Sequence, residues 1–104
     1  MNAHPHVLRA ALSAALLLGA GAALAAEDLQ ARAWAATCAT CHGTTGNADT
    51  GIPPIAGQDA TRLFNTLKAF RDGTRPATVM HQHTKGYTDD ELRRLANHFA
   101  RQQP

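Results

Sequence analysis

The sequence predicts a small all-α domain built from three main helices. Three segments carry apolar residues at helical spacing, and stretches rich in glycine and proline separate them. No segment shows the alternation of apolar and polar residues that is typical of strands. The sequence has no internal repeat and no low-complexity linker, so it indicates a single folded domain.

The first quarter of the chain predicts a secretory signal peptide. A basic residue precedes an apolar run over residues 10–24, and the run ends in small residues at an A-x-A cleavage site. The run is weakly hydrophobic and is short for a bilayer span of about 20 residues. We therefore expect a leader of residues 1–25, with cleavage after Ala25 or Ala26. The mature domain is then residues 26–104, without a membrane span and with a periplasmic location.

The charge and the size of this domain narrow the classes of function. Without Arg9, nine Lys and Arg face eight Asp and Glu, which gives a formal charge of +1. A nucleic-acid-binding protein would show a basic stripe, so nucleic acid is not an expected partner. A domain this small buries little surface and usually needs a disulfide, a metal or a cofactor to be stable.

The first two predicted helices differ in composition. The first covers about residues 28–41 and is rich in alanine. The second covers about residues 59–71, with Asp59 as its N-cap and Gly73 as its stop. Its expected buried stripe consists of Leu63, Phe64, Leu67 and Phe70.

The third predicted helix covers about residues 89–102. Thr88 and Glu91 form the T-x-x-E capping box that marks its start. We expect His98 to lie at the surface of this helix. The expected buried face consists of Leu92, Leu95, Ala96 and Phe99. Residues 43–57 and 73–87 are expected to be loops, with a short helical turn after Pro76.

The segment TCATCHGTTG holds the only two cysteines, Cys38 and Cys41, with His42 directly after them. A disulfide between them would close a loop of only a few residues, so it would add little stability. A thioredoxin-type motif would need a βαβ setting. A zinc site would need a further ligand from His81 or His83, and the spacing of these histidines from the cysteines is not typical of zinc sites. C-x-x-C-H is the pattern of covalent haem attachment, because positions i and i+3 place both thiols on one face of a helix.

The order of these motifs resembles that of the class I c-type cytochromes. C-A-T-C-H is followed by a Gly- and Pro-rich loop, a helix, a lone methionine and a C-terminal helix. The resemblance covers residues 26–104. It implies the small cytochrome c fold, with three main helices wrapped round one covalently attached haem c. It also implies that Leu29 and Trp34 pack against Leu95 and Phe99, where the first and last helices cross.

The resemblance implies two axial ligands for the haem iron. His42 would be the first, and the carbonyl of Pro53 would accept its other ring N–H. Met80 is the only methionine apart from the initiator, and it lies in an expected loop where family members carry the sixth ligand. His81 and His83 are the rivals of Met80, although histidines in a polar loop are usually solvated.

Iron with two protein ligands has no open position for a substrate, so we expect one-electron transfer rather than enzyme activity. The segments FRDGTRPATVM and KGYTDDELRRLANHFARQ resemble the cytochrome subunit of flavocytochrome c sulfide dehydrogenase. In that family a flavoprotein oxidises sulfide and passes electrons to the haem subunit. The resemblance therefore implies a periplasmic FAD flavoprotein as the redox partner of a single-haem subunit. Two alternatives stay open: a free soluble cytochrome that shuttles electrons to a terminal oxidase, and a five-coordinate haem sensor or peroxidase.

Overall fold

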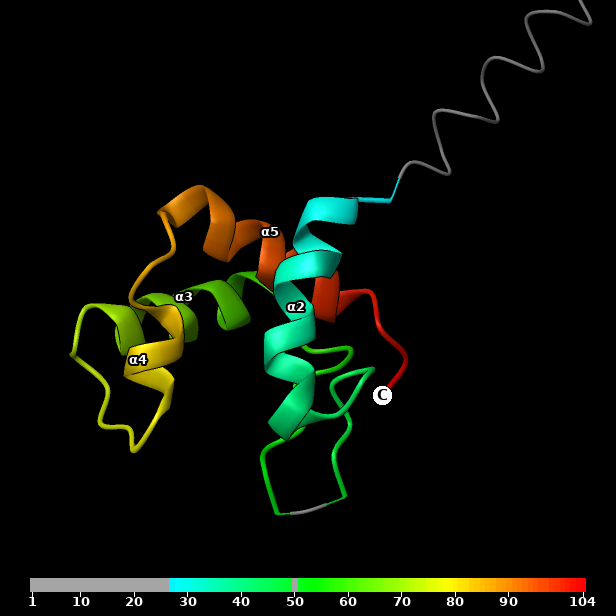
Figure 1. Ribbon diagram of the computed structural model, residues 1–104, viewed down its shortest axis with the longest axis horizontal. Coiled ribbons are helices and arrows are strands. Elements are labelled where there is room, and N and C mark those ends of the chain that lie inside the picture. The colour runs from blue at the N-terminus through cyan, green and yellow to red at the C-terminus, as the bar shows by residue number, and fades with distance from the viewer. Residues whose placement is uncertain (1–26, 50) are drawn as a thin grey trace, which may run out of the picture.

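The computed structural model describes residues 27–49 and 51–104, and these residues form four helices without a strand (Figure 1). The helices are α2 (Leu29–His42), α3 (Ala60–Arg71), α4 (Met80–Thr84) and α5 (Asp89–Ala100). The predicted all-α class is confirmed. The predicted leader and its cleavage site lie outside the described residues. No helix in the described part of the chain is long and apolar enough to cross a membrane.

The starts of the helices are set by side-chain caps. The Asp59 carboxylate accepts a hydrogen bond from the backbone N–H of Arg62 at 2.8 Å, as the sequence predicts for the start of α3. At the start of α5 the Thr88 N–H donates to Glu91 Oε2 at 2.8 Å, which closes the predicted capping box. The helices α2, α3 and α5 begin and end within two residues of the predicted bounds.

The core lies where α5 packs against α2 and α3, and α4 packs on α3 (Figure 1). The predicted face of α5 is buried throughout, while on α3 only the first half of the stripe is fully buried. Leu67 and Phe70 are half-buried. The buried residues of the cluster are Ala35, Leu63, Phe64, Leu92, Leu95, Ala96 and Phe99.

The contact between α2 and α5 differs from the expectation at one residue. Leu29 is 69% exposed, so its predicted packing against Leu95 and Phe99 is wrong. Ala31, which is fully buried, and Ala35 form the contact instead. Alanine has a short side chain, so the two helix backbones can approach closely and the first turn of α2 extends beyond the core. Trp34 does pack against the core cluster, as predicted.

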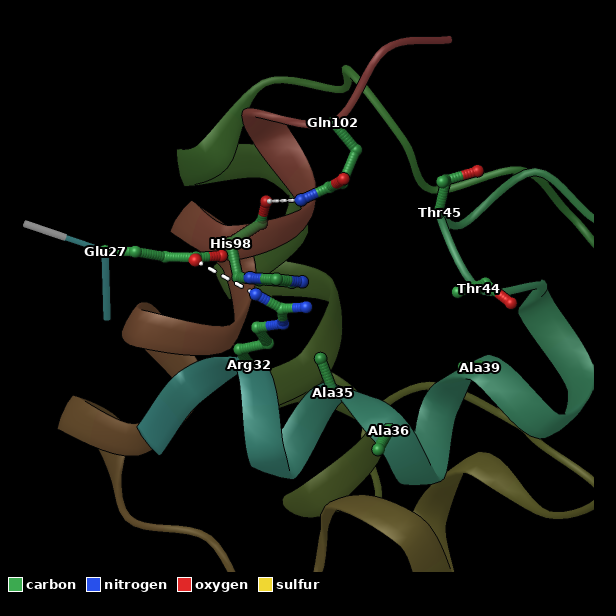
Figure 2. Close-up of a pocket in the computed structure, with 9 residues that line it drawn as sticks. All are labelled: Glu27, Arg32, Ala35, Ala36, Ala39, Thr44, Thr45, His98 and Gln102. Atoms are coloured by element: carbon green, nitrogen blue, oxygen red, sulfur yellow. Dashed lines mark hydrogen bonds and ion pairs between the residues drawn. The ribbon is translucent and has the colours of Figure 1, made fainter. Parts of the chain in front are cut away.

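His98 is buried, although the sequence predicts it at the surface: its exposed fraction is 7%. It follows Leu95 by three residues on α5, so it shares the face that turns towards α2. Its ring meets the Phe99 ring edge-on, with 5.2 Å between centroids. Burial lowers the pKa of His98, and Arg101 adds to this effect. Its ring lines a groove of about 380 Å³, together with residues of α2, Gln102, and Thr44 and Thr45 that follow α2 (Figure 2).

Asp28 joins the start of α2 to α5. Its carboxylate accepts the backbone N–H of Ala31 at 2.9 Å and two hydrogen bonds from Arg94 at 2.7 and 2.8 Å. The Arg94 guanidinium also lies 4.7 Å from the centroid of the Trp34 ring. The hydrogen bonds from Arg94 hold the pKa of Asp28 well below its ordinary range, and the Ala31 N–H adds to this effect.

Asp28→Asn is expected to destabilise the protein in a pH-dependent way. A carboxylate whose pKa is depressed by folding contributes stability above its unfolded pKa of about 4, and the contribution is lost as pH falls towards the folded pKa. Asparagine still caps the helix, so only the charged pair is removed. The melting temperature of the variant should therefore lie below that of the wild type at pH 7, and the difference should close as pH falls below about 4.

Asp49→Asn provides the control, because Asp49 is exposed and makes no ion pair with the described residues. Thermal unfolding followed by circular dichroism measures all three proteins. A difference between wild type and Asp28→Asn that stays constant with pH would contradict the role given to the pair.

Candidate haem-binding site

The last turn of α2 presents both cysteines and His42. Cys38 is half-buried against the core cluster, Cys41 is exposed, and both are free thiols. Burial raises the pKa of Cys38, and a hydrogen bond with Thr37 opposes this effect. Their spacing of three residues places the thiols on one face of the helix, as the sequence predicts.

His42 is held in one orientation by the loop that follows α2. Its Nδ1 lies 2.9 Å from the carbonyl oxygen of Pro53, which is the contact that the family resemblance implies. A carbonyl oxygen only accepts hydrogen bonds, so the proton of the neutral imidazole is on Nδ1. The lone pair of Nε2 is therefore free to bind a metal, and the same contact fixes the direction of the ring.

Two glycines place Pro53 within reach of His42. Gly43 (φ 85°) ends α2, and a Cβ there would come within 3.1 Å of the backbone of Asn47. Gly46 (φ 85°) approaches Phe99 equally closely, and its carbonyl accepts the N–H of Ile55 at 2.9 Å. The loop therefore returns along the end of α5 and carries Pro53 back to His42.

Met80 is the first residue of α4, whereas the sequence predicts an irregular loop at this position and a helical turn somewhere after Pro76. His83 is exposed. His81 is half-buried, and its Nδ1 is buried without a hydrogen-bond partner among the described residues. Of the two histidines considered as alternatives to Met80 as the iron ligand, His81 is therefore the more buried.

Thr84 is a residue of this region that sequence reasoning misses. It is 2% exposed, and its Oγ1 donates a hydrogen bond to the carbonyl of Met80 at 2.9 Å. Its only signal in the sequence is its position four residues after Met80, where the two residues share one face of a helix. Threonine is common in polar loops, so the sequence does not predict its burial.

The side chains of this region fit a covalent haem. Two free thiols, an imidazole with Nε2 available and a thioether are the donors that haem c requires. Trp34, Ile55 and Leu67 are half-buried apolar residues packed on the core cluster. Within residues 27–49 and 51–104, no three His, Cys, Asp or Glu side chains form a metal-binding group, so the zinc interpretation gains no support.

Comparisons with known proteins agree with this donor set. A family model described as cytochrome c oxidase, cbb3-type, subunit III matches residues 21–98. Cytochrome c-554(548) of Halomonas halodenitrificans is 36% identical over 88 residues, which are 81% of this chain and 100% of that protein. Cytochrome c-553 of Nitratidesulfovibrio vulgaris is 33% identical over 86% of this chain and 90% of its own length.

A further relative is the cytochrome subunit of sulfide dehydrogenase from Chlorobaculum tepidum. It is 43% identical over 63 residues, and the match covers 61% of this chain but only 57% of that protein. The matched family model spans most of the chain, and the two cytochromes named above are matched along nearly their whole length. The chain therefore belongs to this cytochrome c family: it is a class I c-type cytochrome, an electron-transfer protein whose cofactor is haem c.

Proposed function

We propose that the chain is a periplasmic one-electron carrier in which Cys38 and Cys41 attach the haem and His42 and Met80 are its axial ligands. The observation that carries this proposal is the hydrogen bond from His42 Nδ1 to the Pro53 carbonyl, which leaves Nε2 free for iron. Residues 1–25 would be the leader for export, and residues 26–104 the mature cytochrome domain.

Each residue has a separate role in this proposal. When bound, haem c supplies an iron that takes up and releases one electron. The two cysteines would attach the haem to α2, and the Pro53 carbonyl fixes the orientation of the His42 ring, whose Nε2 would bind the iron. The thioether sulfur of Met80 favours the reduced metal and raises the potential relative to a second histidine. Half-buried Ile55 and Leu67 exclude water, which disfavours the extra positive charge of the oxidised state.

For the partner, we propose a periplasmic FAD flavoprotein, with this chain as the electron-transfer subunit of a sulfide dehydrogenase. The support is the 43% identity to the cytochrome subunit of sulfide dehydrogenase from Chlorobaculum tepidum. The match leaves a large part of that relative uncovered. A single C-x-x-C-H motif gives this chain one haem.

The distribution of charge supports a stable complex rather than a transient one whose association is guided by electrostatic attraction. Two haem propionates would bring the formal charge of +1 for residues 26–104 to about −1. Most arginines are engaged within the fold: Arg32 and Arg94 pair with carboxylates, and Arg93 stacks on the Phe64 ring at 4.2 Å. A strong ring of one sign, which speeds the encounter of diffusing partners, is not expected here.

The surface offered to the flavoprotein would be an apolar patch around the end of α2. It consists of Ala39, Ile52, Pro53 and Pro54, of which the two prolines are exposed. Small side chains at Ala39 and Thr40 would let a partner approach the thioether edge closely, and that edge is the expected exit for the electron.

The partner proposal predicts a stable heterodimer. Gel filtration of a fresh periplasmic extract should place the cytochrome with a flavin-containing protein, at a mass well above that of the single chain. Electron transfer within the complex should depend weakly on ionic strength, because few exposed charges take part. Elution at the monomer mass, together with transfer to an oxidase that slows steeply with salt, would contradict the subunit role.

A free carrier is the second candidate. It is favoured by the matches to cytochromes c-554(548) and c-553, which cover 100% and 90% of those proteins. In this case the same extract would give a monomer, and the reduced protein would be oxidised by membranes that contain a terminal oxidase. The haem-ligand assignments are the same for both candidates.

A further inference from the structure

Met80 begins a helix that is too short to hold its own position. α4 has five residues, and its N-cap, Val79, is exposed and makes no capping hydrogen bond through its side chain. Isolated helices shorter than about 12 residues are marginal in water. The position of Met80 must therefore be set by contacts from outside α4.

The connection between Met80 and the rest of the fold begins at the opposite end of α4. Buried Thr84 donates its hydroxyl to the Met80 carbonyl at 2.9 Å, which ties the last residue of α4 to the first. The N–H of Tyr87 donates to the Thr84 carbonyl at 3.2 Å. The segment of residues 85–88, which we term the α4–α5 loop, is thus connected to Met80 through one turn of helix.

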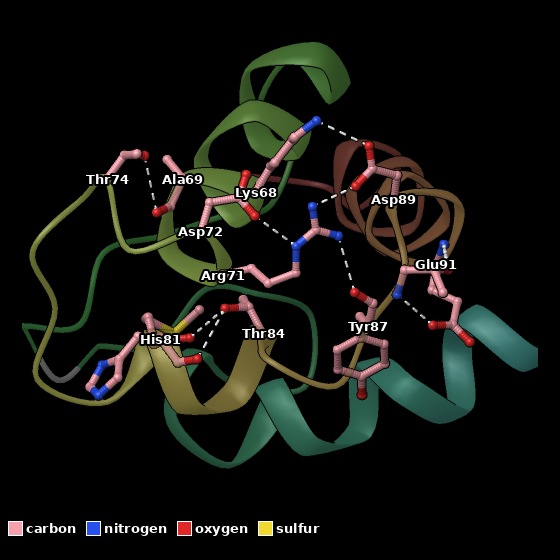
Figure 3. A network of polar contacts seen from close by, with 12 residues as sticks. Lys68, Ala69, Arg71, Asp72, Thr74, His81, Thr84, Tyr87, Asp89 and Glu91 are labelled. Carbon is pink, nitrogen blue, oxygen red and sulfur yellow. Dashed lines mark hydrogen bonds and ion pairs between the residues drawn. The ribbon is translucent and has the colours of Figure 1, made fainter.

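Arg71, the last residue of α3, holds the α4–α5 loop in place (Figure 3). Its Nη1 donates to the Tyr87 carbonyl at 3.1 Å, and its Nη2 lies 2.6 Å from Asp89 Oδ1. Its Nε donates to Asp72 Oδ1 at 3.0 Å. The side chain is only 19% exposed. Its planar guanidinium thus donates to three acceptors in a partly enclosed position.

The residue that Arg71 holds also contacts the helix of the C-x-x-C-H motif. The rings of Tyr87 and Trp34 meet edge-to-face, with 6.0 Å between their centroids. Trp34 lies on α2, one turn before Cys38. The α4–α5 loop is therefore packed on one side against α2 and fixed on the other by α3.

We propose that Arg71 is a positioning residue for Met80. Its fork fixes the α4–α5 loop, and through Thr84 it fixes the start of α4, so that the Met80 sulfur stays on the iron. This inference rests on the proposed function, in which Met80 is an axial ligand. Without the fork, the Met80 segment moves away from the iron more often, and an added ligand finds the iron accessible for a larger fraction of the time.

The test is the rate at which cyanide binds to the oxidised, haem-loaded protein. Arg71→Gln should bind cyanide about tenfold faster than the wild type, because it loses hydrogen bonds made by a charged donor. Arg71→Lys should behave nearly like Arg71→Gln, since an ammonium group cannot reproduce the planar fork. Arg62→Gln is the matched control: it removes the same charge from exposed Arg62, also on α3, and should leave the rate unchanged.

A second variant guards against misfolding of the first. Thr84→Val keeps the buried shape and removes the hydroxyl, so it should also bind cyanide faster. If Arg71 only joined the helices, its substitution would lower the melting temperature without changing the rate of cyanide binding. The proposal would be overturned if Arg71→Gln bound cyanide as slowly as Arg62→Gln, or if Arg71→Lys bound it as slowly as the wild type.

The unaltered protein separates this inference from the function on which it rests. Its oxidised form should show the far-red absorption band of a sulfur-to-iron bond. Absence of the band would overturn the assignment of Met80 itself, and the role of Arg71 with it. Presence of the band with unchanged cyanide rates in both the Arg71 and the Thr84 variants would overturn the role of Arg71 alone.

Discussion

Replacing Met80 by histidine is expected to lower the reduction potential substantially. Axial ligands shift haem potentials over a range of about 0.8 V, and a thioether sulfur stabilises the reduced iron more than an imidazole does. The far-red sulfur-to-iron band of the oxidised protein should disappear in the same variant. Redox titration followed by visible absorption measures both effects in one experiment.

Met80→Ala tests the same assignment by a different route. Removing the thioether should open the iron to carbon monoxide in the reduced state and to cyanide in the oxidised state. His81→Ala and His83→Ala are the controls and should keep the wild-type potential and spectrum. If Met80→Ala keeps them instead, the ligand is one of the two histidines. A wild-type protein that binds carbon monoxide readily would favour the five-coordinate alternative.

Loss of the haem attachment is expected to have the largest effect on folding. Cys38→Ala or Cys41→Ala should leave at most one thioether, and the double variant should leave none. A domain of this size has too small a core to offset the entropy of folding easily, so the attached haem supplies much of its stability. The double variant should be largely unfolded by circular dichroism, and its haem should be extracted by acidified organic solvent.

Two further measurements sharpen this prediction. Thr40→Ala alters an exposed residue between the two cysteines and should keep both thioethers and the wild-type fold. Expression in the cytoplasm, without the machinery that attaches haem, should give a mostly unfolded chain. A compact apo-protein that melts cooperatively would show that the protein core is sufficient without the haem.

The sequence alone determined the three long helices and showed the C-x-x-C-H motif, but it did not place α4, which begins at Met80. Local signals carried this information: Asp59 caps α3, Thr88 and Glu91 close the capping box of α5, and C-x-x-C-H lies within a few consecutive residues. Such signals act over three or four residues, so they can be read without knowing which segments meet in space. The contact of His42 with Pro53 was also predicted, but through resemblance to a family.

Only the tertiary structure decided which side chains of α2 are buried and that His98 of α5 is covered. Leu29 is exposed and Ala31 buried because α2 crosses α5 over its alanines, and His98 is buried because the same crossing covers its side of α5. The partners of Arg71 lie one, 16 and 18 residues away along the chain, on segments that meet only in the fold. Hydrophobic periodicity identifies an apolar face but not the helix that will cover it, because burial depends on long-range packing.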